Sequence, residues 1–406
     1  MTTPRRSFLR MSLPVTIPLL ALFFASNALA VSFADIQFGG FVSQGYLQSN
    51  DNNYPIETAD GTFDFREYGV NASTNFGAHL RVGGQLFGQK LGKYGDDKIL
   101  LDWAVADYNF RQEIGLRVGR VKYPRSLHSE VIDADSLRPF IFLPQSIYDA
   151  RLRDFQSSFD GAMLYGTLTA GEGSFDYKVF YGDISMEPDA GVADFFNTTS
   201  IFANPPGVSS QTMDHVAGTS IAWNTPISGL RVAAYYSTFK NLDTVGPFFA
   251  VPSADVSLNL TTVEYTSASI EYITANWTLT GEYLIQDTEN LTTLPSFIAP
   301  PSTSSSRQTS FYLSASRRMN DRIELGAYYS RLYQNDPPPG SAPSTTHQND
   351  WVVSGRYDLN DNLLFKLEVH FINGTASIFN VPGISNPPGE LQDSMTLFAA
   401  KTTYTF

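Results

Sequence analysis

The feature that most constrains the fold is a repeated alternation of apolar and polar residues in short segments. In residues 362–371, apolar side chains at every second position alternate with Lys366, Glu368 and His370. Successive side chains of a β-strand point to opposite faces, so this pattern predicts a strand with one apolar face. Similar segments recur along the chain, each of about ten residues, the length of a tilted membrane-spanning strand. After residue 30, no apolar run is long enough for a membrane-spanning helix.

The connections between these segments alternate in length. Tight turns such as Asn320-Asp321 and Asn360-Asp361 follow the even-numbered strands, and long connections such as 287–307 and 334–349 follow the odd-numbered ones. Short turns on one rim and long loops on the other are typical of a transmembrane antiparallel β-barrel, and an even strand count brings both termini to the short-turn, periplasmic side. The sequence predicts sixteen strands, at 36–48, 63–74, 78–89, 98–108, 111–121, 159–169, 174–185, 214–224, 229–239, 263–273, 276–286, 308–318, 322–333, 350–358, 362–372 and 394–406.

The first thirty residues predict export. Arg5, Arg6 and Arg10 precede an apolar segment, and Ala28-Leu29-Ala30 supplies a small-x-small cleavage pattern. This is the layout of a secretory signal peptide, so residues 1–30 are expected to be removed and the mature chain to begin at Val31. The arginine pair also fits a twin-arginine signal, and the export route stays open.

The composition of the mature chain excludes some functions. Removing residues 1–30 leaves 24 basic against 40 acidic residues, a formal charge of −16, which argues against nucleic acid as a partner. The chain contains no cysteine, so it has no disulfide or thiol site. Residues 31–406 show no break in composition, and one all-β domain is expected.

The chain resembles the bacterial outer-membrane porin superfamily. The last strand ends in Phe406 with Tyr404 two positions before it, as porins do, and residues 38–46 and 119–124 are similar to the phosphate-selective porin group. The resemblance implies a passive diffusion channel of sixteen strands, assembled as a homotrimer in outer-membrane lipid, which passes small polar or ionic solutes. It also implies that Tyr404 and Phe406 form the signal read by the barrel-assembly machinery.

The third long connection, residues 122–158, differs from the others. Residues 137–143 read Leu-Arg-Pro-Phe-Ile-Phe-Leu, which is too apolar for a solvated loop and needs a surface to pack on. The inner wall of the barrel offers such a surface, and the resemblance implies the same, because the third loop of sixteen-stranded porins narrows the lumen. A cap across the barrel mouth and packing on a neighbouring subunit are the alternatives.

Charged residues on this loop and on the preceding strands are the candidates for a pore constriction. Opposed charges would set up a transverse field that favours polar solutes, although salt bridges that pin the loop to the wall are the alternative role. The candidate lining residues are Arg81, Arg111, Glu113, Arg117, Arg120, Glu130, Asp133, Asp135 and Arg138.

The alternation leaves ion selectivity undecided. The predicted inner wall carries eight basic and eight acidic residues. This balance of charge puts specificity for phosphate in doubt. The bases are Arg81, Arg111, Arg117, Lys178, Arg231, Arg356, Lys366 and Lys401; the acids are Glu67, Asp102, Glu113, Asp176, Glu271, Glu282, Glu324 and Glu368.

Two other functions remain open, a barrel hydrolase and an adhesion or binding barrel that acts through its loops. A hydrolase needs a histidine beside a nucleophile, but no Gly-x-Ser-x-Gly motif accompanies His79, His128, His215, His347 or His370. No metal-ligand spacing is present either, so no cofactor or metal is expected. Conductance distinguishes the pore from the adhesion barrel, because only the pore requires it.

Overall fold

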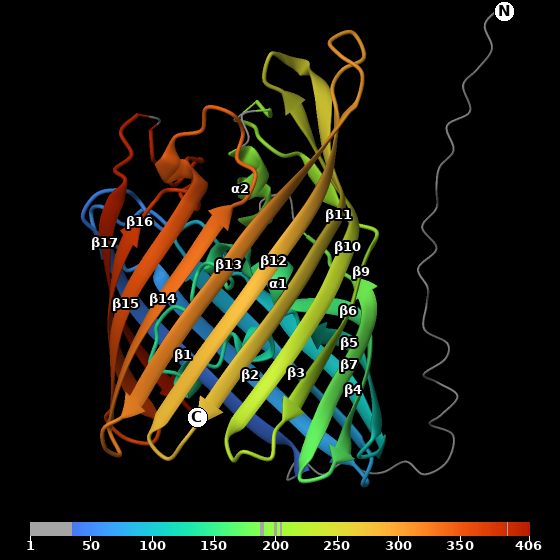
Figure 1. Ribbon diagram of the computed structural model, residues 1–406, viewed down its shortest axis with the longest axis vertical. Coiled ribbons are helices and arrows are strands. Elements are labelled where there is room, and N and C mark those ends of the chain that lie inside the picture. Colours follow the sequence, from blue (N-terminus) through green and yellow to red (C-terminus); the bar gives the residue numbers. More distant parts are fainter. Residues whose placement is uncertain (1–34, 187–190, 199–200, 204, 388) are drawn as a thin grey trace, which may run out of the picture.

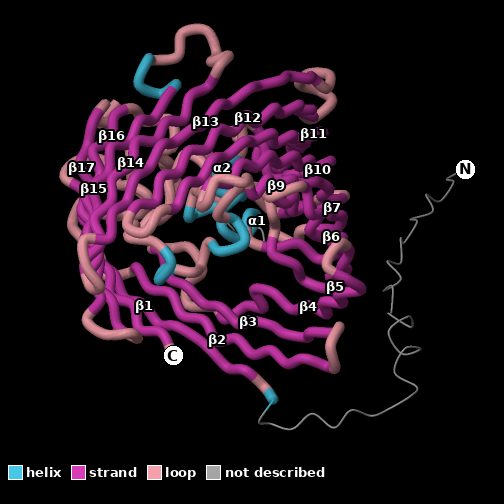
Figure 2. The backbone as a smooth tube through the Cα atoms, turned by 60° about the horizontal axis from the view of Figure 1, so that its bottom comes forward, coloured by secondary structure: helices cyan, strands magenta, loops and turns pink. Residues whose placement is uncertain are grey.

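The computed structural model describes residues 35–186, 191–198, 201–203, 205–387 and 389–406. The predicted signal peptide lies outside these residues and stays a prediction. The described chain forms one antiparallel sheet that closes on itself when β1 (Gln37–Ser49) pairs with β17 (Ser394–Thr405). Figures 1 and 2 show the resulting barrel, with tight turns on one rim and larger loops on the other.

The predicted count of sixteen strands is confirmed. β8 (Ser210–Thr212) and β9 (His215–Asn224) both pair with β10, so they are two parts of one interrupted strand of the barrel wall. The remaining strands are β2 (Phe65–Phe76), β3 (Leu80–Leu91), β4 (Ile99–Arg111), β5 (Ile114–Lys122), β6 (Ser158–Ala170), β7 (Gly173–Asp183), β10 (Leu230–Phe248), β11 (Val251–Ile273), β12 (Trp277–Thr293), β13 (Ser302–Arg318), β14 (Ile323–Gln334), β15 (His347–Asp358) and β16 (Leu363–Asn373).

The long connection predicted at 287–307 is wrong, because most of it is strand. β12 and β13 stay paired from Trp277↔Arg317 up to Thr292↔Ser302, and β10 and β11 are extended in the same way. Figure 1 shows these strands rising above the rest of the barrel. The added parts of β12 and β13, residues 287–293 and 302–307, are rich in serine and threonine and lack an apolar face, so the alternation that marks a wall strand is missing there. Backbone pairing and the ion pair of Arg307 with Asp287 continue the sheet. The extended parts of β10 and β11, in contrast, bury Leu242, Val256 and Leu260.

The alternation of each wall strand separates an apolar outer face from a polar inner face. On β15 and β16, Trp351 and Phe371 are exposed on the outside, whereas Lys366, Glu368 and His370 are buried inside. Exposed aromatic side chains gather near both rims, as expected for a barrel in a bilayer; they include Trp223, Trp277 and Tyr404 near the short turns and Tyr181, Trp351 and Phe371 near the loops.

None of the helices in the described parts of the chain is long and apolar enough to span a membrane. The helical segments belong to the connections instead: η2 (Ser129–Val131), η3 (Asp135–Leu137), η4 (Ala150–Leu152) and α1 (Arg153–Gln156) between β5 and β6, α2 (Gly191–Asn197) between β7 and β8, and η5 (Pro343–Thr346) before β15. The predicted connection at 334–349 is confirmed as a loop over residues 335–346.

The connection between β5 and β6, residues 123–157, folds into the lumen (Figure 2). The carboxylate of Glu368 on β16 accepts hydrogen bonds from the backbone N–H groups of Ile141 and Phe142, at 2.8 and 3.0 Å. The ring of Phe142 stacks on Phe65 of β2, with 5.2 Å between the ring centroids. Residues 140–143 of the apolar segment are buried and pack on the inner wall, as predicted, whereas Leu137 at its start is 70% exposed. We call residues 123–157 the inner loop.

The terminal residue closes the barrel. Two backbone hydrogen bonds of 3.0 Å join Phe406 to Gly40 of β1, and a Cβ at Gly40 would lie 2.5 Å from the Phe406 ring. Glycine at position 40 therefore leaves the space that the terminal ring fills.

Deleting Phe406 is expected to lower the cellular yield of folded barrel several-fold, because β17 loses its last bonds to β1 and an open edge is costly in lipid. The measurement is the fraction of heat-modifiable protein on gels of outer-membrane extracts. Phe38→Ala removes an exposed aromatic ring near the same rim without shortening β17, and is the control. Equal yields of the deletion variant and the wild type would contradict a role of Phe406 in assembly.

Candidate functional site

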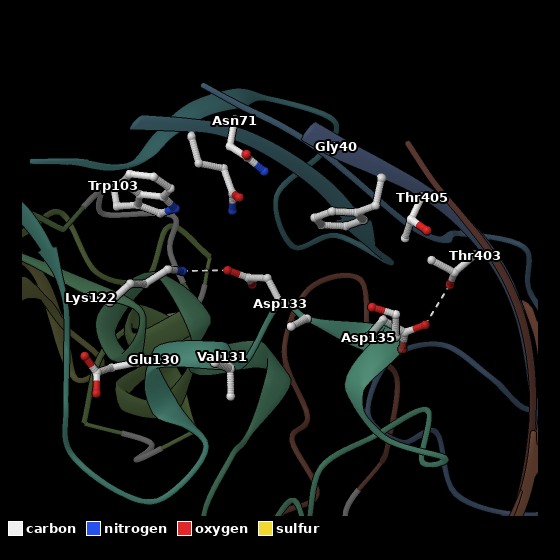
Figure 3. A pocket seen from close by; sticks show the side chains of 14 residues that line it. Gly40, Asn71, Trp103, Lys122, Glu130, Val131, Asp133, Asp135, Thr403 and Thr405 are labelled. Atoms are coloured by element: carbon white, nitrogen blue, oxygen red, sulfur yellow. Dashed lines mark hydrogen bonds and ion pairs between the residues drawn. The ribbon is translucent and has the colours of Figure 1, made fainter. Parts of the chain in front are cut away.

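Space remains on one side of the lumen, between residues 130–136 of the inner loop and the wall formed by β17 and β1 to β5. One cavity of about 250 Å³ is lined by Asn71, Gln85 and Trp103 from the wall and by Glu130 and Asp133 from the loop. Figure 3 shows wall and loop side chains pointing toward one another across this cavity. The lining is mostly polar, so the cavity suits water and hydrophilic solutes.

Further cavities adjoin the first, and one of about 540 Å³ near the short turns shares Ser136 and Thr405 with it and reaches Arg356 and Asp358 of β15. A second one, of about 250 Å³, shares Trp103, Lys122 and Glu130 with it and adds Arg81 and Arg117. A third shares Asp133 and measures only about 50 Å³; Glu67, Arg138, Arg153 and Lys401 are among the residues that line it. The free space along the loop therefore narrows beside Asp133.

Asp133 belongs to a buried ring of four alternating charges. Lys122 lies 2.5 Å from Asp133 and 2.6 Å from Asp102, and Arg153 lies 2.8 Å from Asp133 and 2.9 Å from Asp102. Burial favours the protonated form of Asp133, but Arg153 and Lys122 together outweigh it and hold its pKa well below the usual range. The ring is neutral and ties the loop to β4 and β5.

Asp135 attaches the same part of the loop to β16 and β17. Its carboxylate lies 2.9 Å from Nζ of Lys366 and 3.4 Å from Nζ of Lys401, and it accepts a 2.7 Å hydrogen bond from Thr403. Burial opposes ionisation, but the two lysines hold the pKa of Asp135 far below its usual range. These contacts hold the loop against the wall, which is the alternative role that the sequence left open for the loop charges.

Six of the nine predicted lining residues reach the cavities. Arg117 pairs with Asp107 at 2.7 Å, Arg81 donates a 3.1 Å hydrogen bond to Ser73, and Glu130 pairs with Lys178. The six are Arg81, Arg117, Glu130, Asp133, Asp135 and Arg138.

The structure does not bring the other three to the cavities. Arg111 and Glu113 lie at the short turn after β4, 73% and 52% exposed, where they pair with each other at 3.5 Å. Arg120 pairs at 3.1 Å with Asp160, which alternates along β6 with the buried Phe159 and is half exposed. Arg120 and Asp160 therefore face the outside of the barrel.

Strict alternation with the inward Asp102 places Trp103 on the outer face of the barrel, but its side chain lines the first two cavities. The register between β3 and β4 shifts after Gln85, where Gln85 faces Trp103 but Leu86 faces Leu101. This bulge turns both Asp102 and Trp103 toward the lumen. Before the bulge, Ile99, Leu100 and Leu101 are all apolar and exposed, so this part of the strand does not alternate and gives no phase for Trp103.

Arg138 is the one charged lining residue of the smallest cavity, among those described, that forms no ion pair within 4.0 Å. Its Nη2 donates to the carbonyl oxygen of Ile132 at 3.0 Å, and its buried Nε has no partner in the described chain. Asp135 lies near it but is occupied by two lysines and Thr403. The narrowest space therefore carries an uncompensated positive charge.

The histidines have structural partners. His370 lies 2.8 Å from Asp350 and 2.9 Å from Glu368, but it is buried beneath Phe142 of the inner loop. Burial, with Arg138 adding to it, lowers the pKa of His128 to about 4, so this imidazole is neutral near pH 7. In the described residues, no three acidic or histidine side chains are placed to hold a metal ion.

Comparison with known proteins shows similarity in structure. No family model matches the sequence, and no curated protein matches it. The fold is similar to in-vitro folded OmpT of Vibrio cholerae, with a TM-score of 0.55, 13% identity and coverage of 91% of this chain and 97% of that one. Another form of OmpT is described as a trimer.

Two further similar structures are a protein described as an anion-selective porin and a complex of OmpF with daunomycin. The anion-selective porin from Comamonas acidovorans gives a TM-score of 0.54 at 14% identity, covering 91% of this chain and 99% of that chain. OmpF of Salmonella typhi in complex with daunomycin gives 0.55 at 12% identity, covering 91% and 97%. At these identities the similarity concerns the fold, and this chain shares with these proteins the fold of a closed antiparallel β-barrel, here of sixteen strands.

Proposed function

We propose that the protein is a passive diffusion channel of the outer membrane for small polar or ionic solutes. The observation that carries this proposal is the row of three adjoining cavities between the inner loop and the wall, each of which is lined by several charged side chains. A barrel of sixteen strands encloses a lumen too wide for wall side chains to fill. The inner loop crosses this lumen, and the space between the loop and the wall of β17 and β1 to β5 is the proposed route.

The charges along this route favour anions. Lys122, Arg153 and Lys401 have acidic partners, whereas Arg138 has none within ion-pair distance at the smallest cavity. A fixed positive charge in a narrow space of low dielectric attracts anions and repels cations. The similarity to an anion-selective porin agrees with this preference.

A binding or adhesion role of the outer loops is the second candidate, favoured by the extension of β10 to β13 above the rim (Figure 1). For a hydrolase the arrangement offers less support. Segment 139–142 of the inner loop covers His370, the histidine with two carboxylate partners. We therefore propose no catalytic role.

We also propose that three copies of the chain assemble, in outer-membrane lipid, through the outer faces of β2 to β6. Ala72, Gly84 and Ala104 lie side by side in register there, which leaves a flat surface. Arg120 and Asp160 lie on the same outer wall, and charged side chains facing lipid are costly. A neighbouring copy would cover them, and the trimer described for OmpT agrees with this.

The assembly prediction is a mass of three chains for the protein in mild detergent, measured by light scattering corrected for bound detergent. Arg120→Ala is expected to shift the population toward monomers, because Asp160 loses its partner. Arg307→Ala breaks an exposed pair with Asp287 on the extended strands, and is expected to leave the trimer intact. A monomeric wild type would refute the proposal.

The proposed route predicts that the size of the side chain at position 89 controls conductance. Gln89 lines the smallest cavity, and no side-chain hydrogen bond holds it in the described structure. Gln89→Ala is expected to raise single-channel conductance in planar bilayers and Gln89→Trp to lower it. Leu86→Ala, on the outer face of the same strand, is the control that leaves conductance unchanged. Equal conductance in all four proteins would exclude this cavity as the route, and folded protein that never conducts would exclude the channel.

The positive charge of Arg138, which has no ion-pair partner, predicts that the channel prefers anions to cations. In a potassium chloride gradient, the reversal potential of the wild type is expected to show a preference for chloride. Arg138→Glu is expected to reverse the preference, because it exchanges the unpaired charge at the narrowest space. Arg111→Glu changes a charge at the exposed rim and should shift the potential much less, since salt screens it within about 10 Å. Equal shifts for both variants would remove Arg138 as the determinant.

A further inference from the structure

A cavity of a different character lies between α1, α2 and the inner wall of β10 to β14. It measures about 110 Å³. Aromatic and aliphatic side chains make up much of its lining, among them Phe155, Phe195, Phe239, Tyr265 and Leu284. It therefore offers a ligand a more apolar surface than the first two cavities of the proposed route do.

One buried cation also lines this apolar cavity. Arg125 is 3% exposed, and its guanidinium lies over the ring of Tyr265 at 5.0 Å. Its Nη2 donates to the carbonyl oxygen of Ile147 at 2.6 Å and to Oε1 of Gln156 at 3.1 Å. Its buried Nε has no hydrogen-bond partner in the described part of the chain. The guanidinium therefore retains at least one unused donor.

The charge of Arg125 is also without a counter-ion. The second arginine of the cavity, Arg151, is neutralised by Asp149 through contacts of 2.9 and 2.6 Å. Arg125 has no carboxylate within 4.0 Å among the described residues. The nearby Glu282 already accepts hydrogen bonds from the backbone N–H of Leu127 and the hydroxyl of Tyr148. A buried charge without a partner is costly, and an anionic ligand would supply the partner.

We propose that this cavity binds a small organic anion, a monocarboxylate with an aromatic or branched apolar body. The carboxylate would take the free donors of Arg125, since a guanidinium recognises carboxylates through paired N–H groups. The apolar body would lie against Phe155, Phe239 and Tyr265. This inference deepens the proposed channel and rests on it for the route by which the anion arrives, whereas binding itself requires only the folded barrel.

The test is isothermal titration of the purified, folded full-length protein in detergent with benzoate, benzamide and acetate. Benzoate is expected to bind more tightly than either of the others, because benzamide lacks the charge and acetate lacks the apolar body. Arg125→Gln is expected to weaken benzoate binding by roughly tenfold to a hundredfold. Arg307→Gln removes an exposed arginine outside the cavity and is expected to leave binding unchanged.

A second variant keeps the proposal testable if Arg125→Gln fails to fold, which heat modifiability on gels reveals. Phe195 lines the cavity but is 45% exposed, so Phe195→Ala spares the core and is expected to weaken benzoate more than acetate. Equal binding of benzoate and benzamide to the wild type, or no binding, overturns the proposal. If the protein binds benzoate but does not conduct, the anion site stands and the channel proposal is overturned. If it conducts but does not bind benzoate, the channel proposal stands and the anion site is overturned.

Discussion

The rest of the lumen depends on the bonds that hold the inner loop to β16 and β17. Lys366 is fully buried and contacts both Asp135 and the carbonyl oxygen of Phe140, and Glu368 accepts two backbone N–H groups of the loop. Charges buried this deeply must be paired, so without the loop Lys366 would lose its loop carboxylate and Glu368 would keep only His370. Further contacts with Asp102 of β4 and Glu282 of β12 hold the loop across the lumen and leave separate spaces on its two sides.

This asymmetry divides the interior into regions of different chemistry. On the side of β1 to β5, paired charges line a narrowing row of cavities in which Arg138 alone lacks an ion-pair partner among the described lining residues of the smallest one. On the side of β10 to β14, apolar rings surround Arg125. Three arginines of the interior cavities, Arg81, Arg125 and Arg138, form no ion pair among the described residues, although the chain carries a net negative charge.

Much of the fold could be predicted from the sequence, because alternation reports the two faces of each strand directly. Trp351 and Phe371 lie outside and Arg356 and Lys366 inside, as their positions in the pattern predict. The apolar segment 137–143 also predicted a loop packed on the inner wall. The error at 287–307 has the same origin, since strands that rise above the bilayer need no apolar face and lose the pattern.

The sequence by itself determined the number of strands, the face on which most regular side chains lie and the segment that forms the inner loop, because these follow from local periodicity and local composition. Only the tertiary structure decided which charges meet. The bulge at Asp102 and Trp103, the outward pair of Arg120 with Asp160, and the isolation of Arg125 and Arg138 depend on register shifts and on contacts between residues far apart in the chain. Such contacts are set when the barrel closes around the loop, and no local pattern of residues encodes them.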